Sequence, residues 1–102
     1  MSYAYVWEFR VPLDLHAEFE QHYGPGGTWA QLFGGSAGYI ETLLLKDRST
    51  VDRYVTVDRW RDEEAFRVFR SSFSQQYEEL DRECGRLTAD ETLIGEFTEC
   101  PA

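Results

Sequence analysis

Aromatic and non-aromatic residues alternate at the start of the chain. The odd positions from 3 to 9 are all aromatic, whereas the even positions from 4 to 10 read Ala, Val, Glu and Arg. This period of two predicts a strand over residues 2–11 with one strongly aromatic face. Pro12 ends the strand, because proline cannot donate a hydrogen bond to a neighbouring strand.

The period changes to three and four between residues 62 and 87, which predicts one long helix with a single apolar stripe. Asp62 is a favourable N-cap, and Glu63 and Glu64 place negative charge in the first turn, where the helix dipole favours it. A strand rich in β-branched and aromatic residues, 53–60, leads directly into this helix, so the helix must pack back on its own sheet. The stripe consists of Phe66, Phe69, Phe73, Tyr77, Leu80, Cys84 and Leu87.

The remaining segments complete a sheet with helices on one face. We expect a helix over 15–23 capped by Asp14, a short helix over 29–33 capped by Thr28, and strands over 39–46 and 93–98, with turns at 47–50 and 88–91. The order β-α-α-β-β-α-β matches the split β-α-β arrangement. The sequence thus predicts a single α+β domain over residues 1–102, with a ferredoxin-like, four-stranded antiparallel sheet.

Several predicted strands are apolar on both faces, so one layer of helices does not cover them. Leu43, Leu44 and Leu45 are consecutive, and we expect both sides of this strand to be covered. A lone chain would expose an apolar face well over ~400 Å², more than soluble monomers usually tolerate. We therefore predict a homodimer that pairs sheet to sheet about a two-fold axis, as a dimeric α+β barrel.

Composition and charge limit the classes of molecule that the protein is expected to bind. The net charge of -9, from 19 acidic and 10 basic residues, argues against nucleic acid and anionic membrane surfaces as partners. Cys84 falls on the helix stripe and Cys100 near the C-terminus, without the spacing of a metal or redox motif. With no apolar run long enough to cross a bilayer, we expect a cytoplasmic protein with reduced thiols. The 16% of aromatic residues also suit a pocket for a small planar molecule.

Few side chains suit proton transfer near neutral pH. His16 and His22, both on the first predicted helix, are the only histidines, and His22 adjoins the glycine break at 24–27. Trp29 and Phe33 lie on a short helix between glycine clusters, where they either cover a cavity or plug the core. Asp58 lies within a strand, and we expect it to be solvated. If it faced the cavity instead, burial would raise its pKa and make it a possible base.

The chain resembles the antibiotic biosynthesis monooxygenase family of dimeric α+β barrels. The resemblance covers nearly the whole chain and rests on the strand from Tyr54 to Trp60 followed by Arg61-Asp62-Glu63-Glu64-Ala65-Phe66, on Gly38-Tyr39-Ile40 and on Gly95-Glu96-Phe97. It implies an oxygenase without metal, flavin or haem, using molecular oxygen as co-substrate. In such members an electron-rich phenol is deprotonated, passes an electron to dioxygen and recombines with it.

Only some of the family's functional residues have the same residue type at the matching position of this chain. Trp60 stands where the family has its Trp, whereas Thr56 replaces an Asn that some catalytic members carry, and Phe66 replaces a Tyr. The haem-degrading branch needs a His about where Phe69 lies. On this basis we expect His22 as proton acceptor, with Trp60 and Thr56 as further catalytic residues. The expected substrate-binding residues are Trp29, Phe33, Tyr54, Phe66, Phe69 and Phe73.

Three functions remain open. The first is a cofactor-independent monooxygenase acting on a planar phenolic, quinol or polyketide-type aromatic substrate. The second is a non-catalytic dimeric module, which binds a small ligand or serves as an accessory protein in a biosynthetic pathway. The third, a haem-degrading monooxygenase, is disfavoured because Phe69 cannot ligate iron.

Overall fold

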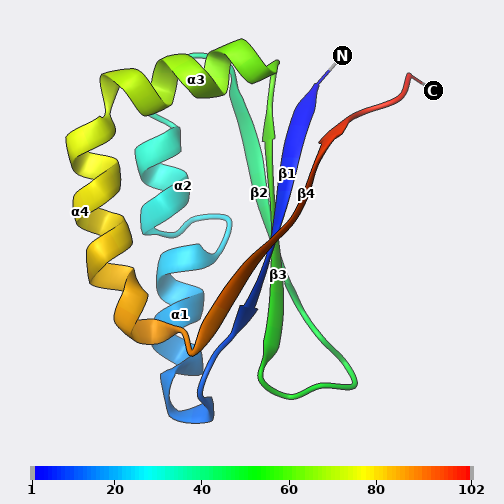
Figure 1. Ribbon diagram of the computed structural model, residues 1–102, viewed down its shortest axis with the longest axis vertical. Coiled ribbons are helices and arrows are strands. Elements are labelled where there is room, and N and C mark those ends of the chain that lie inside the picture. The colour runs from blue at the N-terminus through cyan, green and yellow to red at the C-terminus, as the bar shows by residue number, and fades with distance from the viewer. Residues whose placement is uncertain (1, 102) are drawn as a thin grey trace.

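A computed structural model describes residues 2–101 and shows a four-stranded antiparallel sheet with all helices on one face (Figure 1). The strands are β1 (Tyr3–Arg10), β2 (Tyr39–Lys46), β3 (Arg53–Trp60) and β4 (Asp90–Thr98). Their order across the sheet is β2-β3-β1-β4, so β1 and β3 are central. The predicted ferredoxin-like α+β architecture is therefore confirmed.

The alternation in β1 has the predicted structural meaning. Tyr3, Tyr5 and Phe9 are buried under the helices, while the residues between them are half-buried. β1 pairs with β3 without a register shift, from Tyr3 opposite Trp60 to Arg10 opposite Arg53. Directly opposed residues share a face of the sheet, so this register assigns each residue of β3 to the helix side or the outer side.

The strand predicted over 93–98 begins earlier, at Asp90, so the expected turn at 88–91 was wrong in its second half. Asp90 and Glu91 continue the ladder opposite Arg10 and Phe9. Sequence reasoning missed these residues because acidic side chains are poor strand formers. The long pairing with β1 outweighs that preference.

The predicted long helix is divided into α3 (Glu63–Ser72) and α4 (Ser74–Cys84), which run at a clear angle to one another in Figure 1. Phe73 lies between them with a φ of -118°. All stripe residues still face the core side or are half-buried, so the bend lets both segments follow the sheet. A short 3-10 turn, η2 (Gly85–Leu87), follows α4.

Helix starts follow the predictions only in part. Asp62 caps α3 as predicted, accepting a hydrogen bond from the backbone N–H of Ala65 at 2.8 Å. Asp14 does not cap α1 (His16–Tyr23), because it lies within a preceding 3-10 turn, η1 (Leu13–Leu15). Thr28 is the first residue of α2 (Thr28–Phe33) rather than its cap.

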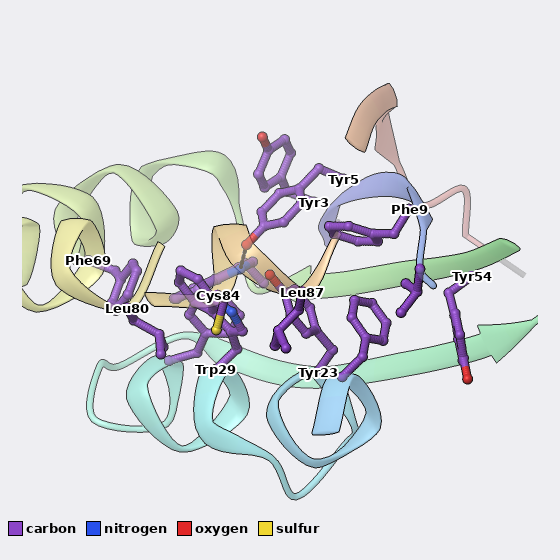
Figure 2. Packing of buried hydrophobic residues seen from close by; sticks show 14 of the residues in the cluster. Tyr3, Tyr5, Phe9, Tyr23, Trp29, Tyr54, Phe69, Leu80, Cys84 and Leu87 are labelled. Carbon is purple, nitrogen blue, oxygen red and sulfur yellow. Dashed lines mark hydrogen bonds between the residues drawn. The ribbon is translucent and has the colours of Figure 1, made fainter. Parts of the chain in front are cut away.

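The core lies between the sheet and the helices and is largely aromatic (Figure 2). Trp60, Tyr54, Phe19 and Phe69 are fully buried, and neighbouring rings pack with centroids 4.2 to 6.5 Å apart, distances close to those of favourable aromatic contacts. Cys84 is buried on the stripe, as expected, and is a free thiol. Among residues 2–101, no helix combines the length and apolar character needed to cross a membrane.

The outer face of the sheet has no covering layer in the single chain. Leu43 and Leu45 are 41% and 51% exposed, and Phe97 of β4 is 50% exposed. The expectation that both sides of β2 are covered is therefore not met within one chain. Leu44, which lies opposite Thr56, packs against the core on the helix side.

Gly38 joins the loop after α2 to β2 with a φ of +92°, which only glycine adopts without strain. A Cβ at this position would lie 2.6 Å from the Cβ of Ala65. The carbonyl of Gly38 accepts a hydrogen bond from the N–H of Arg61 at 2.6 Å. This glycine therefore allows the start of β2 to approach the start of α3 closely.

Candidate functional site

A cavity of about 150 Å³ lies between the helix side of the sheet and the helices α1, α2 and α4. Aromatic rings form most of its wall, and protic side chains from β2 and β3 interrupt the aromatic lining. The lining residues are Tyr5, Trp7, Phe9, Tyr23, Trp29, Phe33, Thr42, Thr56, Asp58, Tyr77, Asp81 and Glu91. Such a mixture is typical of sites that bind small aromatic molecules and orient them through a few polar groups.

Asp58 is the only acidic residue of the lining that is buried, at 7% exposure. It lies in the middle of β3, opposite Tyr5 of β1 and Thr42 of β2. The residues Thr56, Asp58 and Trp60 are all on the helix side, since alternate residues of a strand share a face. The solvated placement expected for Asp58 is therefore wrong, and the cavity-facing alternative holds.

Hydrogen bonds converge on the Asp58 carboxylate. The hydroxyl of Thr42 donates to its Oδ1 at 2.6 Å. Because the Thr42 proton is used in this bond, the hydroxyl of Tyr39, 2.7 Å away, must donate to Thr42. On the other side, Trp60 Nε1 donates to the hydroxyl of Tyr5 at 3.4 Å, so the Tyr5 proton is free to point toward Asp58.

The buried carboxylate has a perturbed titration. Burial raises the pKa of Asp58 from 3.8 to about 6, and hydrogen bonds from Thr42 and Tyr5 offset part of that effect. Burial also raises the pKa of Tyr5 well above its ordinary value, and the nearby Asp58 charge adds to this effect. A carboxyl group with a pKa near 6 can both accept and return a proton at neutral pH.

Two exposed acids, Asp81 of α4 and Glu91 of β4, mark the mouth of the cavity. Although Glu91 is exposed as a residue, partial desolvation of its carboxylate, reinforced by the charge of Asp81, raises its pKa. Within residues 2–101, no Lys, Arg or His lines this cavity. Its potential is therefore negative, which favours neutral or cationic ligands over anionic ones.

The structure brings three of the predicted site residues into the cavity wall, namely Thr56, Trp29 and Phe33. The indole N–H of Trp29 is buried, and within the described residues it has no hydrogen-bond acceptor. Tyr23 and Cys84 are its polar neighbours, but neither has the geometry of a hydrogen bond to it. This N–H is therefore an unpaired donor in the core beside Tyr23 and Cys84, which carries a free-energy cost.

Trp60 lies behind the wall and is fully buried, so it does not line the cavity. It is linked to the cavity through its hydrogen bond to Tyr5. Phe66 packs on the rings of Tyr5 and Trp60, at centroid distances of 4.9 and 5.4 Å, and Phe69 also packs on Trp60. These residues support the wall from the far side.

The other predicted residues are placed away from the cavity lining. Tyr54 is buried near the end of the sheet, where its hydroxyl donates to Glu20. Phe73 stacks on Phe69 at the bend between α3 and α4. His22 is half-buried on α1, with its Nδ1 2.9 Å from the hydroxyl of Thr28.

Sequence reasoning did not select Thr42, Tyr5 or Tyr77 as site residues, although all three line the cavity. The alternation in β1 and β3 gave a usable signal for Tyr5 and Asp58, because it places both on one face. The pairing of Thr42 with Asp58 depends on a register shift between Tyr39 and Glu41 of β2, and no sequence pattern predicts this shift. Within the described chain, no group of three or more His, Cys, Asp or Glu side chains is arranged to hold a metal ion.

Comparisons with known proteins agree with this architecture. The family model for antibiotic biosynthesis monooxygenases matches residues 2–80. SnoaB from Streptomyces nogalater, described as a cofactor-independent oxygenase, is 25% identical. Its native structure superposes with a TM-score of 0.70 and that of a point mutant with 0.74, over 99% of this chain and 95% of the other.

More distant structures share the fold. A conserved protein from Methanosarcina mazei is 12% identical, with a TM-score of 0.72 over 98% of this chain and 94% of its own. No curated protein sequence matches the chain. Since the family model spans most of the sequence and the fold agrees throughout, the chain belongs to the antibiotic biosynthesis monooxygenase family.

Proposed function

We propose that the protein is a cofactor-independent monooxygenase that oxidises a small, neutral phenol or quinol with molecular oxygen. The observation that carries the proposal is the cavity, which combines aromatic walls with buried protic groups. No basic residue of the described range 2–101 lines it. The description of SnoaB, 25% identical, as a cofactor-independent oxygenase supports the same chemistry. In this proposal Trp29 and Phe33 hold the ring, and Thr56 is a polar contact.

The reaction needs a dry site and a place for a proton. Deprotonation of the quinol gives an electron-rich anion, which passes one electron to dioxygen; the resulting radical pair combines to form a carbon–oxygen bond. For a quinol, one oxygen atom ends in the hydroxylated quinone and the other leaves as water.

The volume of the cavity limits the substrate. An apolar cavity of about 150 Å³ accommodates a molecule the size of benzene, and the cavity here has a similar volume. A one- or two-ring quinol is the best match, whereas a three-ring anthrone requires α2 or α4 to move. This narrows the broader range of aromatic substrates expected from the family resemblance.

The same proposal includes a homodimer formed through the outer face of the sheet. Val6, Leu43 and Val57 align across three strands on that face, away from the helices. Ion pairs frame both ends of the apolar area: Arg53 with Glu8 and Asp47 at one end, and Arg59 with Glu41 and Glu99 at the other. Each of these arginines neutralises part of the negative charge of the two acids beside it, which lowers the repulsion between two copies of a chain with a net charge of -9.

The test is oxygen uptake in chelator-treated buffer with hydroquinone, 1,4-dihydroxynaphthalene and anthrone, which have one, two and three rings. We expect the protein to accelerate uptake most for the one- or two-ring substrates, and Thr56→Val to reduce the rate about tenfold. Val68→Glu, on the exposed side of α3, is the matched control. Uptake by the wild-type protein no faster than in buffer would contradict the proposal.

A non-catalytic binding protein is the second candidate. The observation that favours it is that Thr56 and Phe66 offer fewer polar groups than the Asn and Tyr of catalytic relatives. Quenching of the tryptophan fluorescence of Trp7 and Trp29, which both line the cavity, by the same quinols without accelerated oxygen uptake would select this candidate. Haem degradation has less support, because Phe69 is fully buried and both histidines lie on α1, outside the cavity lining.

A further inference from the structure

We infer that Asp58 is the residue that accepts the hydroxyl proton of the ligand bound in the cavity, in place of His22. The inference rests on the proposed function for its catalytic consequence, but it is argued from the geometry of the site. Among the described residues, no other carboxylate is both buried and part of the lining. His22, by contrast, is not part of the lining.

The sheet holds Asp58 at a fixed position. Asp58 lies in a central strand, with Tyr5 directly opposite on one side and Thr42 on the other. Two chains of donors end at the carboxylate: Tyr39 to Thr42 to Asp58, and Trp60 to Tyr5 toward Asp58. Both chains run in one direction, so they stabilise an ionised carboxylate and leave it as an acceptor.

The surroundings do not neutralise this charge. The titratable groups that face Asp58 are phenols from three elements, Tyr5 of β1, Tyr39 of β2 and Tyr77 of α4, and each has a raised pKa, chiefly because of burial. The acids Asp81 and Glu91 lie at the mouth. The guanidinium carbon of Arg70 lies over the ring of Tyr77, 3.8 Å from its centroid, so Arg70 pairs with that ring rather than with Asp58. Hydrogen bonds, and no cationic partner, therefore stabilise the ionised form of the Asp58 carboxylate.

The proposed proton transfer runs from the ligand hydroxyl to Asp58. The O–H bond of the phenol breaks, the proton forms a new bond to an Asp58 carboxylate oxygen, and the electron pair stays on the phenolate oxygen. After dioxygen has added to a ring carbon, the protonated carboxyl returns its proton to the outer peroxide oxygen. The ring carbon then loses its hydrogen as a proton, its C=O bond forms and the O–O bond breaks, and the released hydroxide takes up that second proton and departs as water. Burial supports this role, because it brings the pKa of Asp58 to about 6, close to working pH. Trp60 acts here as a positioning residue, through Tyr5.

The first experiment compares the pH dependence of oxygen uptake with 1,4-dihydroxynaphthalene for wild type, Asp58→Asn and Thr42→Val. We expect wild-type kcat/KM to rise with pH and level off above about 6. Asp58→Asn should lower it 100-fold or more, the usual size of a general-base effect. Thr42→Val should move the midpoint upward, since the lost hydrogen bond no longer lowers the pKa of Asp58.

Two further variants separate this inference from its rival. Asp14→Asn changes an exposed acid outside the cavity and should leave the rate unchanged. If His22→Gln abolishes activity while Asp58→Asn retains it, His22 is the acceptor and the inference is overturned. A Thr42→Val midpoint identical to that of wild type would also contradict the proposed contact.

A second experiment does not depend on turnover. The carbon-13 resonance of the Asp58 carboxyl, identified by its absence in Asp58→Asn, should titrate near pH 6 and shift when phenol is added. If the wild-type protein consumes no oxygen, the proposed function fails, but this resonance still tests the contact. A carboxyl signal unaffected by phenol would overturn the inference.

Discussion

Replacing Asp58 by Asn should make the protein more stable while it makes the protein less active. A buried carboxylate is unfavourable when ionised, and Asp58 has a pKa of about 6 in the folded chain against 3.8 in its unperturbed state. One unit of pKa corresponds to about 1.36 kcal/mol, so the difference between 3.8 and about 6 destabilises the folded state by about 3 kcal/mol once Asp58 is fully ionised. Asn removes the charge and keeps nearly the same shape.

The sign of the pH dependence follows from proton binding. Because the folded pKa is raised, the folded state binds more protons than the unfolded state between pH 3.8 and about 6, so stability falls as pH rises through this window. Below pH 3.8 both states are protonated and the penalty disappears. The stabilisation by Asp58→Asn should thus be about 3 kcal/mol at pH 8 and well under 1 kcal/mol at pH 4.

The assay is urea denaturation of wild type, Asp58→Asn and the control Asp14→Asn at pH 4, 6 and 8. Protein concentration must be held constant, because association in the folded state would add to stability. Other titrating groups, such as Asp47, whose pKa is lowered by backbone hydrogen bonds from Ser49 and Thr50, affect all three proteins equally and cancel. An Asp58→Asn stabilisation that does not grow between pH 4 and pH 8 would refute the assignment of a buried, raised-pKa carboxyl.

Three other predictions test the fold and the assembly. Gly38→Ala should lower the free energy of unfolding by more than about 2 kcal/mol, because a Cβ at this positive φ would clash with Ala65. Gly85→Ala places its Cβ in open space and should change the free energy of unfolding little. Equal effects of the two substitutions in thermal melts would argue against the close approach of β2 and α3 at Gly38. Leu43→Glu should convert the dimer to a monomer in sedimentation velocity while Val68→Glu does not, and a wild-type monomer at all concentrations would remove the dimer from the proposal. Asp62→Ala should cost about 1 kcal/mol in urea denaturation through loss of the α3 cap, and no loss would show that the 2.8 Å contact is not stabilising.

Local patterns were sufficient for most of the secondary structure. Alternation placed β1 within a residue at each end, and the bounds of β2 and β3 agree with those predicted. The stripe from Phe66 to Leu87 identified the helix surface that faces the core, because its spacing depends only on helical geometry. The same pattern did not reveal the bend at Phe73, since a bend that follows the sheet leaves the stripe intact.

The candidate site was less accessible from the sequence. Residues were selected there for their chemical type and family position, which favoured Trp60, Phe69 and Phe73, whereas the structure places none of these three in the cavity lining. Asp58 was expected to be solvated because acids within strands usually face water. Its burial depends on the register of β3 against both β1 and β2, and therefore on contacts between segments far apart in the chain.

The sequence by itself determined the fold class, the aromatic face of the sheet and the surplus of apolar residues on its outer face, because each depends on periodicity within one segment. Only the tertiary structure decided which side chains meet in the cavity and which carboxylate is buried there. The physical reason is that cross-strand register and helix placement set desolvation and hydrogen bonding, and these, rather than residue type alone, give Asp58 its pKa.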